Sequence, residues 1–172
     1  NENAANGTAV GITASASDAD ATTNTIAYTL DDNAGGRFAI DSSTGVVTVA
    51  DGTLLNREAA ASHGITVRAT SADGSSSTQA FTINLNDVDE FDVGTVTDAN
   101  GAANAVNENA ANGTAVGITA LASDADATTN TITYTLDDNA GGRFTIDANT
   151  GVVTVAAALD YETATSHAIT VR

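Results

Sequence analysis

The 172-residue chain contains no cysteine, methionine, proline, tryptophan or lysine. Without cysteine it has no disulfides, no thiolate metal ligands and no thiol nucleophile. The chain has five basic residues, all arginine, and 22 acidic ones, so its net charge is −17. This balance argues against nucleic acid and anionic membrane surfaces as partners, because both require cationic patches. No apolar run approaches the roughly 20 residues of a membrane span, so we expect no direct insertion into a membrane.

Large apolar side chains are also scarce. The chain has only three Tyr and four Phe, and much of its 42% hydrophobic content is alanine. A core built from these residues is small, and the self-repulsion of the acidic chain opposes compaction. We therefore expect something to offset the charge, and a disordered chain is the alternative. The opening Asn and the absence of Met predict that the chain is an excerpt of a longer polypeptide.

The largest signal is an internal repeat. Asn1–Ala50 aligns without a gap to Asn107–Ala156 and differs from it at only five positions. A period of 106 residues is too long for a solenoid and suits one whole domain per repeat. The second copy has no counterpart of Ala69–Asp87, and the first has none of Phe91–Val106. We therefore expect the chain to be a segment of a longer array of repeats, and both copies in this segment to be incomplete.

Short alternating β-branched segments and Gly- or Asn-rich turns predict an all-β chain of tandem Greek-key β-sandwiches, each with seven strands. Arg37 and Arg143 follow paired glycines, and we expect them to hold the acidic turns at 31–32 and 137–138. The strands of one full repeat are expected near 103–108, 114–120, 131–136, 143–146 and 152–155, followed, by analogy with the first copy, by 63–70 and 78–86.

The acidic residues gather in short clusters, often two positions apart, as in Asp18-Ala19-Asp20. Carboxylates spaced in this way in irregular backbone are suited to Ca²⁺, which takes six to eight oxygen ligands. Zn²⁺ would require Cys or His, and the only histidines are His63 and His167. Plain solvated acidic loops are the alternative, which the clustering alone leaves open. No Ser–His–acid arrangement is present, and the recurrence of the carboxylates in both copies suits scaffold ligands, so we expect no enzyme.

An ordered series of motifs resembles a cadherin repeat. It comprises Glu2-Asn3 with Gly7-Thr8, Asp18-Ala19-Asp20, Phe38–Val49, Leu159–Glu162 and Asn86–Glu90. More narrowly, the chain is similar to the cadherin-like tandem repeats of giant bacterial surface adhesins of the RTX type. The resemblance covers nearly the whole chain. It departs from the family at Asn56, where an Asp is usual, and in a linker without proline.

The resemblance implies Ca²⁺ as cofactor, bound at the junction between successive repeats. It divides the chain into residues 1–88, a first repeat without its first strand, and 89–172, the linker plus a second repeat without its last strand. Asp18, Asp20 and Asp73 would serve a preceding junction, and Glu108, Asp160 and Glu162 a following one. The ligands implied for the junction between the two copies are Glu2, Glu58, Asp87, Asp89, Glu90, Asp124 and Asp126.

The function implied is that of a calcium-stiffened extender and adhesion module of a repetitive adhesin on the bacterial cell surface or secreted from it. Its partners would be neighbouring repeats of the same polypeptide. A calcium-dependent, lectin-like module for cell-surface polysaccharide and a homophilic module that binds another copy of itself stay open as alternatives.

Overall fold

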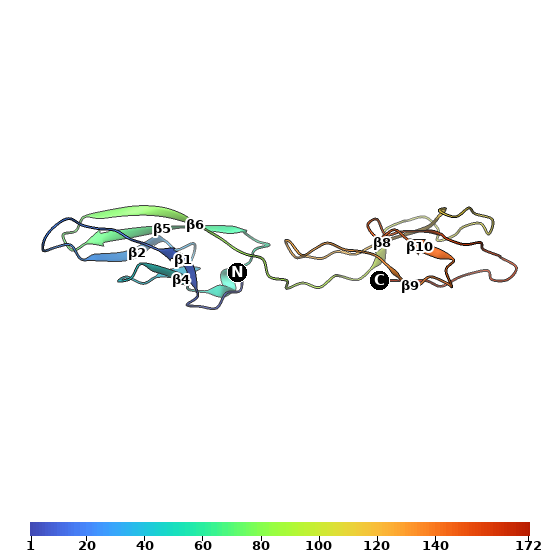
Figure 1. Cartoon of the computed structure of the whole chain (residues 1–172), viewed down its shortest axis with the longest axis horizontal. Coiled ribbons are helices and arrows are strands. Elements are labelled where there is room, and N and C mark those ends of the chain that lie inside the picture. Colours follow the sequence, from blue (N-terminus) through green and yellow to red (C-terminus); the bar gives the residue numbers. More distant parts are fainter. The chain divides into compact units, whose positions relative to one another are not determined.

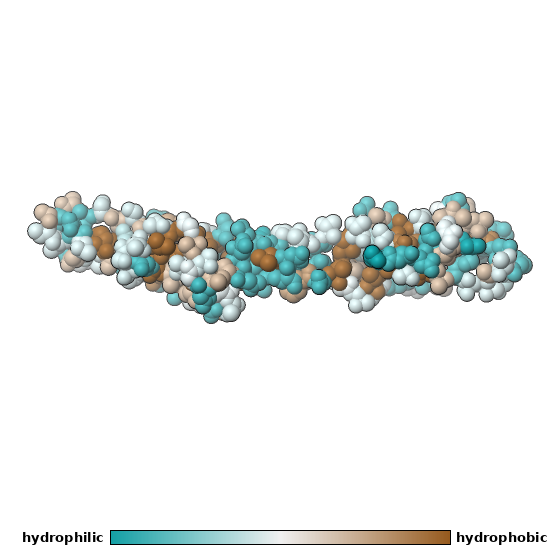
Figure 2. Space-filling model, turned by 60° about the horizontal axis from the view of Figure 1, so that its bottom comes forward, coloured by the Kyte–Doolittle hydropathy of each residue, from teal (hydrophilic) through white to brown (hydrophobic).

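The computed structural model describes all 172 residues and contains almost exclusively β-strands. The chain divides into two compact units, Asn1–Val88 and Asp89–Arg172, and each is described by itself below. The strands run along the length of each unit (Figure 1). The surface is mainly hydrophilic, with the hydrophobic residues in small separate patches (Figure 2). The structure has no helix with the length and apolar character that crossing a bilayer requires.

The first unit is a sandwich of two antiparallel three-stranded sheets. One sheet has the order β1-β4-β3 and the other the order β2-β5-β6. A single 3₁₀ turn, Gly52–Leu54, follows β4. The strands are β1 Ala9–Thr13, β2 Ile26–Asp32, β3 Phe38–Ile40, β4 Val46–Val49, β5 Ser62–Ser71 and β6 Ser76–Asn84.

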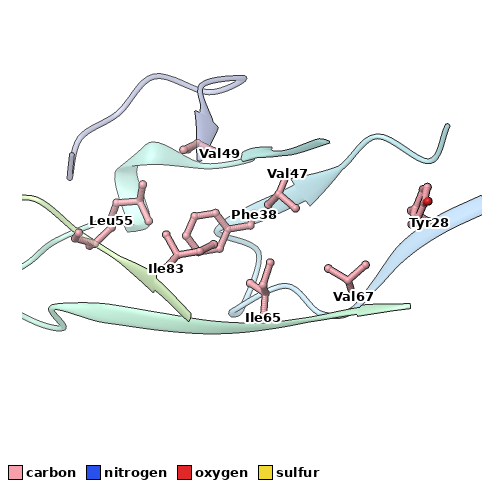
Figure 3. Packing of buried hydrophobic residues seen from close by; sticks show 9 residues of the cluster. Tyr28, Phe38, Val47, Val49, Leu55, Ile65, Val67 and Ile83 are labelled. Atoms are coloured by element: carbon pink, nitrogen blue, oxygen red, sulfur yellow. The ribbon is translucent and has the colours of Figure 1, made fainter. Parts of the chain in front are cut away.

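The core of this unit lies between the two sheets and follows from the two-residue period of the strands. In β4, Val47 and Val49 are buried while their neighbours are only half-buried. Phe38, Leu55 and Ile65 are each no more than 2% exposed. Figure 3 shows Ile83 of β6 beside the ring of Phe38. β6 therefore supplies one wall of the first core.

The second unit has a four-stranded sheet, β10-β11-β8-β7, and a two-stranded sheet, β12-β9. Its core cluster of Val116, Phe144, Val153 and Val155 is smaller than that of the first unit. The strands are β7 Thr97–Asp98, β8 Ala115–Leu121, β9 Leu136–Asp138, β10 Phe144–Ile146, β11 Val152–Val155 and β12 Thr170–Val171.

Sequence equivalence combines the two units into one seven-stranded pattern. β8 to β12 correspond to β1 to β5, β7 adds the first strand beside β8, and β6 adds the last strand beside β5. The full pattern is a four-stranded sheet on a three-stranded one, which is the Greek-key sandwich predicted from the sequence. Each unit shows six of the seven strands.

Two of the strand predictions were wrong in position. The first strand of the second unit is β7 at Thr97–Asp98 rather than 103–108. The later segment packs closely as irregular backbone, and a Cβ at Gly117 would lie 2.2 Å from the carbonyl oxygen of Ala103. β9 starts at Leu136 rather than near 131, because residues equivalent to Ala69–Ser71, which pair with the start of β2, do not occur in the second unit.

The expected role of Arg37 was also wrong. Its guanidinium folds back onto its own turn and donates to the carbonyl oxygens of Ala34 and Leu54. The acidic turn is held instead by Arg68 of β5, whose Nε lies 2.8 Å from Asp31 Oδ1. Arg172 contacts Asp137 in the same way in the second unit. Strand pairing brings the more distant arginine to the turn.

Candidate metal centres

The structure assembles three clusters of carboxylates within the units. In each cluster three side chains offer one oxygen apiece, and these oxygens lie within 4.8 Å of one another. Two clusters belong to the first unit and one to the second. Their members are Glu2, Glu58 and Asp87, then Asp18, Asp20 and Asp73, then Glu108, Asp160 and Glu162.

Glu2 is the anchor of its cluster and only 1% exposed. Its Oε2 accepts a hydrogen bond from the backbone N–H of Arg57 at 2.6 Å, and its Oε1 accepts one from that of Val88 at 2.9 Å. These bonds bring the segment after β6 against the Asn56-Arg57-Glu58 turn. Charged Glu2 is thus fixed by backbone donors.

Arg57 is a residue of this cluster that the sequence analysis missed. Its Nε lies 3.7 Å from Asp87 Oδ1, and its Nη1 donates to the carbonyl oxygen of Leu85. The contact depends on β6 returning beside the turn, which the local sequence does not show. The available signal was the change from Asp160-Tyr161 in the second copy to Asn56-Arg57 in the first.

The equivalent cluster of the second unit keeps the same anchor. Glu108 Oε2 accepts a hydrogen bond from the backbone N–H of Tyr161 at 2.8 Å, as Glu2 does from Arg57. Asp160 accepts bonds from the hydroxyl and the N–H of Thr163, and the hydroxyl bond chiefly holds the pKa of Asp160 below its usual value. No arginine offsets these three carboxylates.

In the Asp18 cluster, Asp18 Oδ1 accepts a hydrogen bond from the backbone N–H of Asp20 at 2.9 Å. The other oxygen, Oδ2, is buried and has no hydrogen-bond partner. Asp73 accepts a bond from the N–H of Ser75, which lowers the pKa of Asp73. A buried carboxylate oxygen without a partner is costly.

Asp89, Asp124 and Asp126 form a further acidic group at the start of the second unit. Asp126 is 2% exposed, and its Oδ1 accepts hydrogen bonds from the N–H groups of Glu90 at 3.1 Å and Phe91 at 3.3 Å. Its own N–H donates to Asp124 Oδ1 at 3.1 Å. As in Asp18, the second oxygen of Asp126 is buried without a partner.

The two carboxylates of Asp89 and Asp126 influence each other's ionisation. Burial opposes ionisation of Asp126, but the N–H groups of Glu90 and Phe91 and a hydrogen bond with Asp89 outweigh it, so the pKa of Asp126 is lowered. The hydrogen bond with Asp126 and its negative charge raise the pKa of Asp89. The backbone donors thus stabilise the ionised form of Asp126, and Asp126 opposes the ionisation of Asp89.

The donor set fits a hard divalent cation. Every member of the groups is a carboxylate, and oxygen ligands select Ca²⁺ or Mg²⁺ over Zn²⁺. The partnerless oxygens of Asp18 and Asp126 are the atoms that such an ion would satisfy. Apart from Glu90, the structure thus places the carboxylates named in the sequence analysis in acidic groups within the units, and their role as ligands stays a prediction.

Comparison with known proteins identifies the sandwich. The model of the cadherin domain family matches residues 1–86 and 103–172. The chain belongs to the cadherin domain family. Cadherin domains are adhesion modules of extracellular regions and are not enzymes. The cadherin part of the predicted resemblance is therefore confirmed, together with the β-sandwich fold.

The curated relatives include protocadherin Fat 4 of Homo sapiens, which is 38% identical over 163 residues, and that of Mus musculus, which is 37% identical. The match covers 93% of this cadherin chain but only 3% of either relative. The crystal structure of mouse cadherin-23 EC22-24 has a TM-score of 0.71 at 28% identity and covers 94% of this chain and 51% of that one. The protocadherin gamma B2 structure of domains 3–6 shares the fold, with a TM-score of 0.75 at 22% identity over 92% of this chain and 41% of that one.

These relatives are animal proteins, and nothing in the comparisons points to a bacterial adhesin. The bacterial surface therefore stays a prediction of the sequence analysis without support from known proteins. The calcium that cadherin domains bind at repeat junctions is a property of the family. It comes to this chain as a proposal, to which the acidic clusters add physical support.

Proposed function

We propose that this chain is an extracellular adhesion module in which Ca²⁺ held by the carboxylate clusters stiffens the tandem cadherin repeats. The observation that carries the proposal is the set of three clusters whose carboxylate oxygens lie within 4.8 Å of one another. With only five basic residues in the chain, a cation from solution would offset the charge of these clusters. The buried partnerless oxygens of Asp18 and Asp126 add support, since such an ion would satisfy them.

The junction between the two repeats would draw ligands from both sides of the Asp87-Val88-Asp89 segment. Asp87 belongs to the Glu2 cluster, and Asp89 lies against Asp126. Two residue steps join them, so chain connectivity alone keeps their Cα atoms within about 7 Å, whatever the orientation of the units. The ligands proposed for this junction are Glu2, Glu58, Asp87, Asp89, Glu90, Asp124 and Asp126.

The remaining clusters would serve other junctions. Asp18, Asp20 and Asp73 would face a preceding repeat, and Glu108, Asp160 and Glu162 a following one. In the first copy, Asp18 and Asp20 occupy the positions that Asp124 and Asp126 occupy in the second. In the second copy, Glu108 occupies the position of Glu2. The proposal thus gives each repeat the same two halves of a calcium site.

We expect calcium to turn the net electrostatic repulsion between the carboxylates at the linker into a net attraction. Without metal the clustered carboxylates repel one another and favour open conformations of the linker. A divalent ion shared between them binds only the ordered arrangement and adds about 2.7 kcal/mol per site at a concentration of 100 times Kd. Extracellular modules commonly bind Ca²⁺ with Kd of about 10⁻⁴–10⁻³ M.

Small-angle X-ray scattering with calcium and with EDTA tests the proposal. We expect calcium to convert a broad distribution of distances into that of one extended particle, and D87N/D89N to lose this response. D32N is the matched control, because Asp32 lies outside the clusters and caps a turn through Ala34 N–H, which an Asn oxygen also accepts. Scattering profiles of the unchanged chain that superimpose with and without calcium would refute the proposal.

Adhesion between copies of the chain is the biological role that the comparisons favour over a bacterial extender. The curated relatives are protocadherins, and one structural neighbour is a cis-dimer of protocadherin gammaB7. Coated beads that aggregate with calcium and disperse with EDTA would support this role. Retention of the chain on a glycan array only in calcium would support the lectin alternative instead.

A further inference from the structure

Five positions of the chain place an Asn or Asp directly before a glycine, a pair of residues that is especially prone to spontaneous rearrangement of the backbone. In this rearrangement the glycine nitrogen attacks the side-chain carbonyl carbon of the preceding residue and closes a succinimide ring. Glycine favours the attack because it has no Cβ to hinder the approach. The five pairs are Asn6-Gly7, Asp51-Gly52, Asp73-Gly74, Asn100-Gly101 and Asn112-Gly113.

Two of the three Asn-Gly pairs are restrained by the strand that follows them in space. Gly7 N–H donates a hydrogen bond to the carbonyl oxygen of Val49 at 2.8 Å, and Gly113 N–H donates one to that of Val155 at 2.7 Å. Both glycines also have a positive φ, of 87° and 89°. A nitrogen held in this way directs its proton at a fixed acceptor and must break that bond before it can react.

The two Asp-Gly pairs are restrained in the same way. Gly52 N–H donates to Asn6 Oδ1 at 2.8 Å, and Gly74 N–H donates to the carbonyl oxygen of Ser71 at 3.0 Å. Asn6 is thereby fixed twice, because its own side chain accepts a bond while the nitrogen of Gly7 is also bound. The fold thus restrains four of the five pairs.

Asn100-Gly101 is the pair that the fold leaves free. Both residues are exposed in the loop after β7, and the N–H of Gly101 has no hydrogen-bond partner. Gly101 also lacks the positive φ of Gly7 and Gly113. In addition, Ala102 N–H donates to Asn100 Oδ1 at 3.0 Å. This donor withdraws electrons from the amide carbon and lies at the oxygen on which negative charge develops when a nitrogen adds to that carbon.

We propose that Asn100 is a site of self-modification, at which the side-chain amide converts to aspartate and isoaspartate with water as the only other reactant. The nitrogen of Gly101 loses its proton to solvent and forms a bond to Cγ of Asn100, and the bond from Cγ to Nδ2 breaks. The leaving nitrogen takes up a proton and departs as ammonia. Water then opens the ring at one of its two carbonyl carbons. One opening gives aspartate, and the other gives isoaspartate, in which the main chain runs through Cβ and Cγ.

The modification changes a loop that is attached to the sheet through Asp98. Asp98 Oδ1 accepts hydrogen bonds from the N–H of Asn100 at 2.9 Å and from that of Thr119 in β8 at 3.0 Å. Conversion of Asn100 adds a second carboxylate two residues after Asp98, and isoaspartate also lengthens the main chain by one carbon atom. Like charges at this distance repel. The modification therefore weakens the attachment of β7, the edge strand, to β8.

The test follows the three Asn-Gly pairs of the full 172-residue chain by peptide mapping and mass spectrometry during incubation at mildly alkaline pH. In the folded protein we expect Asn6 and Asn112 to convert more slowly than Asn100 by about tenfold or more, the factor that corresponds to one backbone hydrogen bond. In urea the three pairs should convert at similar rates, because unfolding releases all three glycine nitrogens. Labelling with an isoaspartyl methyltransferase identifies the isoaspartate at position 100.

Two variants separate this chemistry from an effect on the fold. G101A should slow the conversion of Asn100, because a Cβ hinders the attacking nitrogen, and the fold accepts it, because no atom lies within 4 Å of the added carbon. G64A is the matched control: its Cβ also meets no atom within 4 Å, and the rate at Asn100 should stay unchanged. Conversion of Asn6 or Asn112 as fast as that of Asn100 in the folded chain, or an unchanged rate in G101A, would overturn the inference.

Discussion

Three residues distinguish the acidic cluster around Glu2 from that around Glu108, and one of them, Asp87, is a carboxylate that only the first cluster has. Asn56 replaces Asp160, which removes a negative charge, and Arg57 replaces Tyr161, which adds a positive one near Asp87. Both changes oppose the binding of a cation. If the clusters hold Ca²⁺, introducing the two residues of the second copy should therefore strengthen the binding of Ca²⁺ around Glu2.

We accordingly expect N56D/R57Y to raise the calcium affinity of the chain, by roughly tenfold for each unit of charge placed about 4 Å from the ion. Isothermal titration calorimetry measures the change. The reverse exchange, D160N/Y161R, is the matched control and should weaken a different site. Equal affinities for the unchanged chain and N56D/R57Y would show that Arg57 does not compete with the metal.

A second prediction at the scale of residues concerns acid stability. Asp41 accepts hydrogen bonds from the hydroxyl and N–H of Ser43 and from the N–H of Thr44, and these hold its pKa far below its usual value. A lowered pKa in the folded state contributes stability above the unfolded value of about 3.9, and this contribution is lost as the pH falls toward the folded value.

D41N should therefore flatten the decline of the melting temperature below about pH 4, because the amide keeps an oxygen acceptor but does not titrate. Thermal unfolding followed by circular dichroism at a series of pH values measures this slope. S42A should leave it unchanged, since the second copy carries Ala148 at that position. A slope for D41N equal to that of the unchanged chain would assign the acid sensitivity to other carboxylates.

At the scale of elements, the sequence predicted strands well where both neighbours of a strand lie within the repeat. Val152–Val155 was predicted at its observed bounds, because its β-branched residues alternate between core and partial exposure. The prediction failed for Ile132–Tyr134, since the matching residues of the first copy pair with Ala69–Ser71 and the second copy has no such segment. The length of a strand thus depends on the strand that pairs with it, and the local sequence pattern gives no information about that strand.

The prediction of the acidic sites was limited in the same way, because local sequence does not show contacts with distant residues. The carboxylates were recognisable from motifs of which several recur in both copies, but the Arg57–Asp87 contact and the burial of Asp126 were not. Both depend on the segment from Leu85 to Phe91, which returns to residues far away in the sequence. Residue type was therefore predictable, and the electrostatic surroundings were not.

The two units bury one pair of equivalent leucines to different degrees, which makes a prediction about core packing. Leu55 is 2% exposed beneath β6, whereas its equivalent Leu159 is only half-buried. L55A should destabilise the first unit by about 2–5 kcal/mol, as for other buried leucines, and L159A should cost the second unit less than about 2 kcal/mol. Hydrogen exchange measured by mass spectrometry reports on each unit separately. Equal losses would mean that Leu159 is as well packed as Leu55.

At the scale of the whole molecule, the dominant quantity is the charge of −17 on 172 residues. Monovalent salt screens such repulsion without binding, and raising it from 0.1 to 1 M shortens the screening length from about 10 Å to about 3 Å. In EDTA, sodium chloride should therefore raise the melting temperature gradually.

Calcium should act differently, because an ion held between carboxylates stabilises by mass action at concentrations too low to screen. Additions of about 1 mM, at or above the affinity usual for extracellular modules, should raise the melting temperature more than sodium chloride of equal ionic strength. The increase should saturate, and D18N/D126N should reduce it, since these side chains carry the partnerless buried oxygens. A calcium effect no larger than that of matched sodium chloride would mean that the clusters act only as diffuse charge.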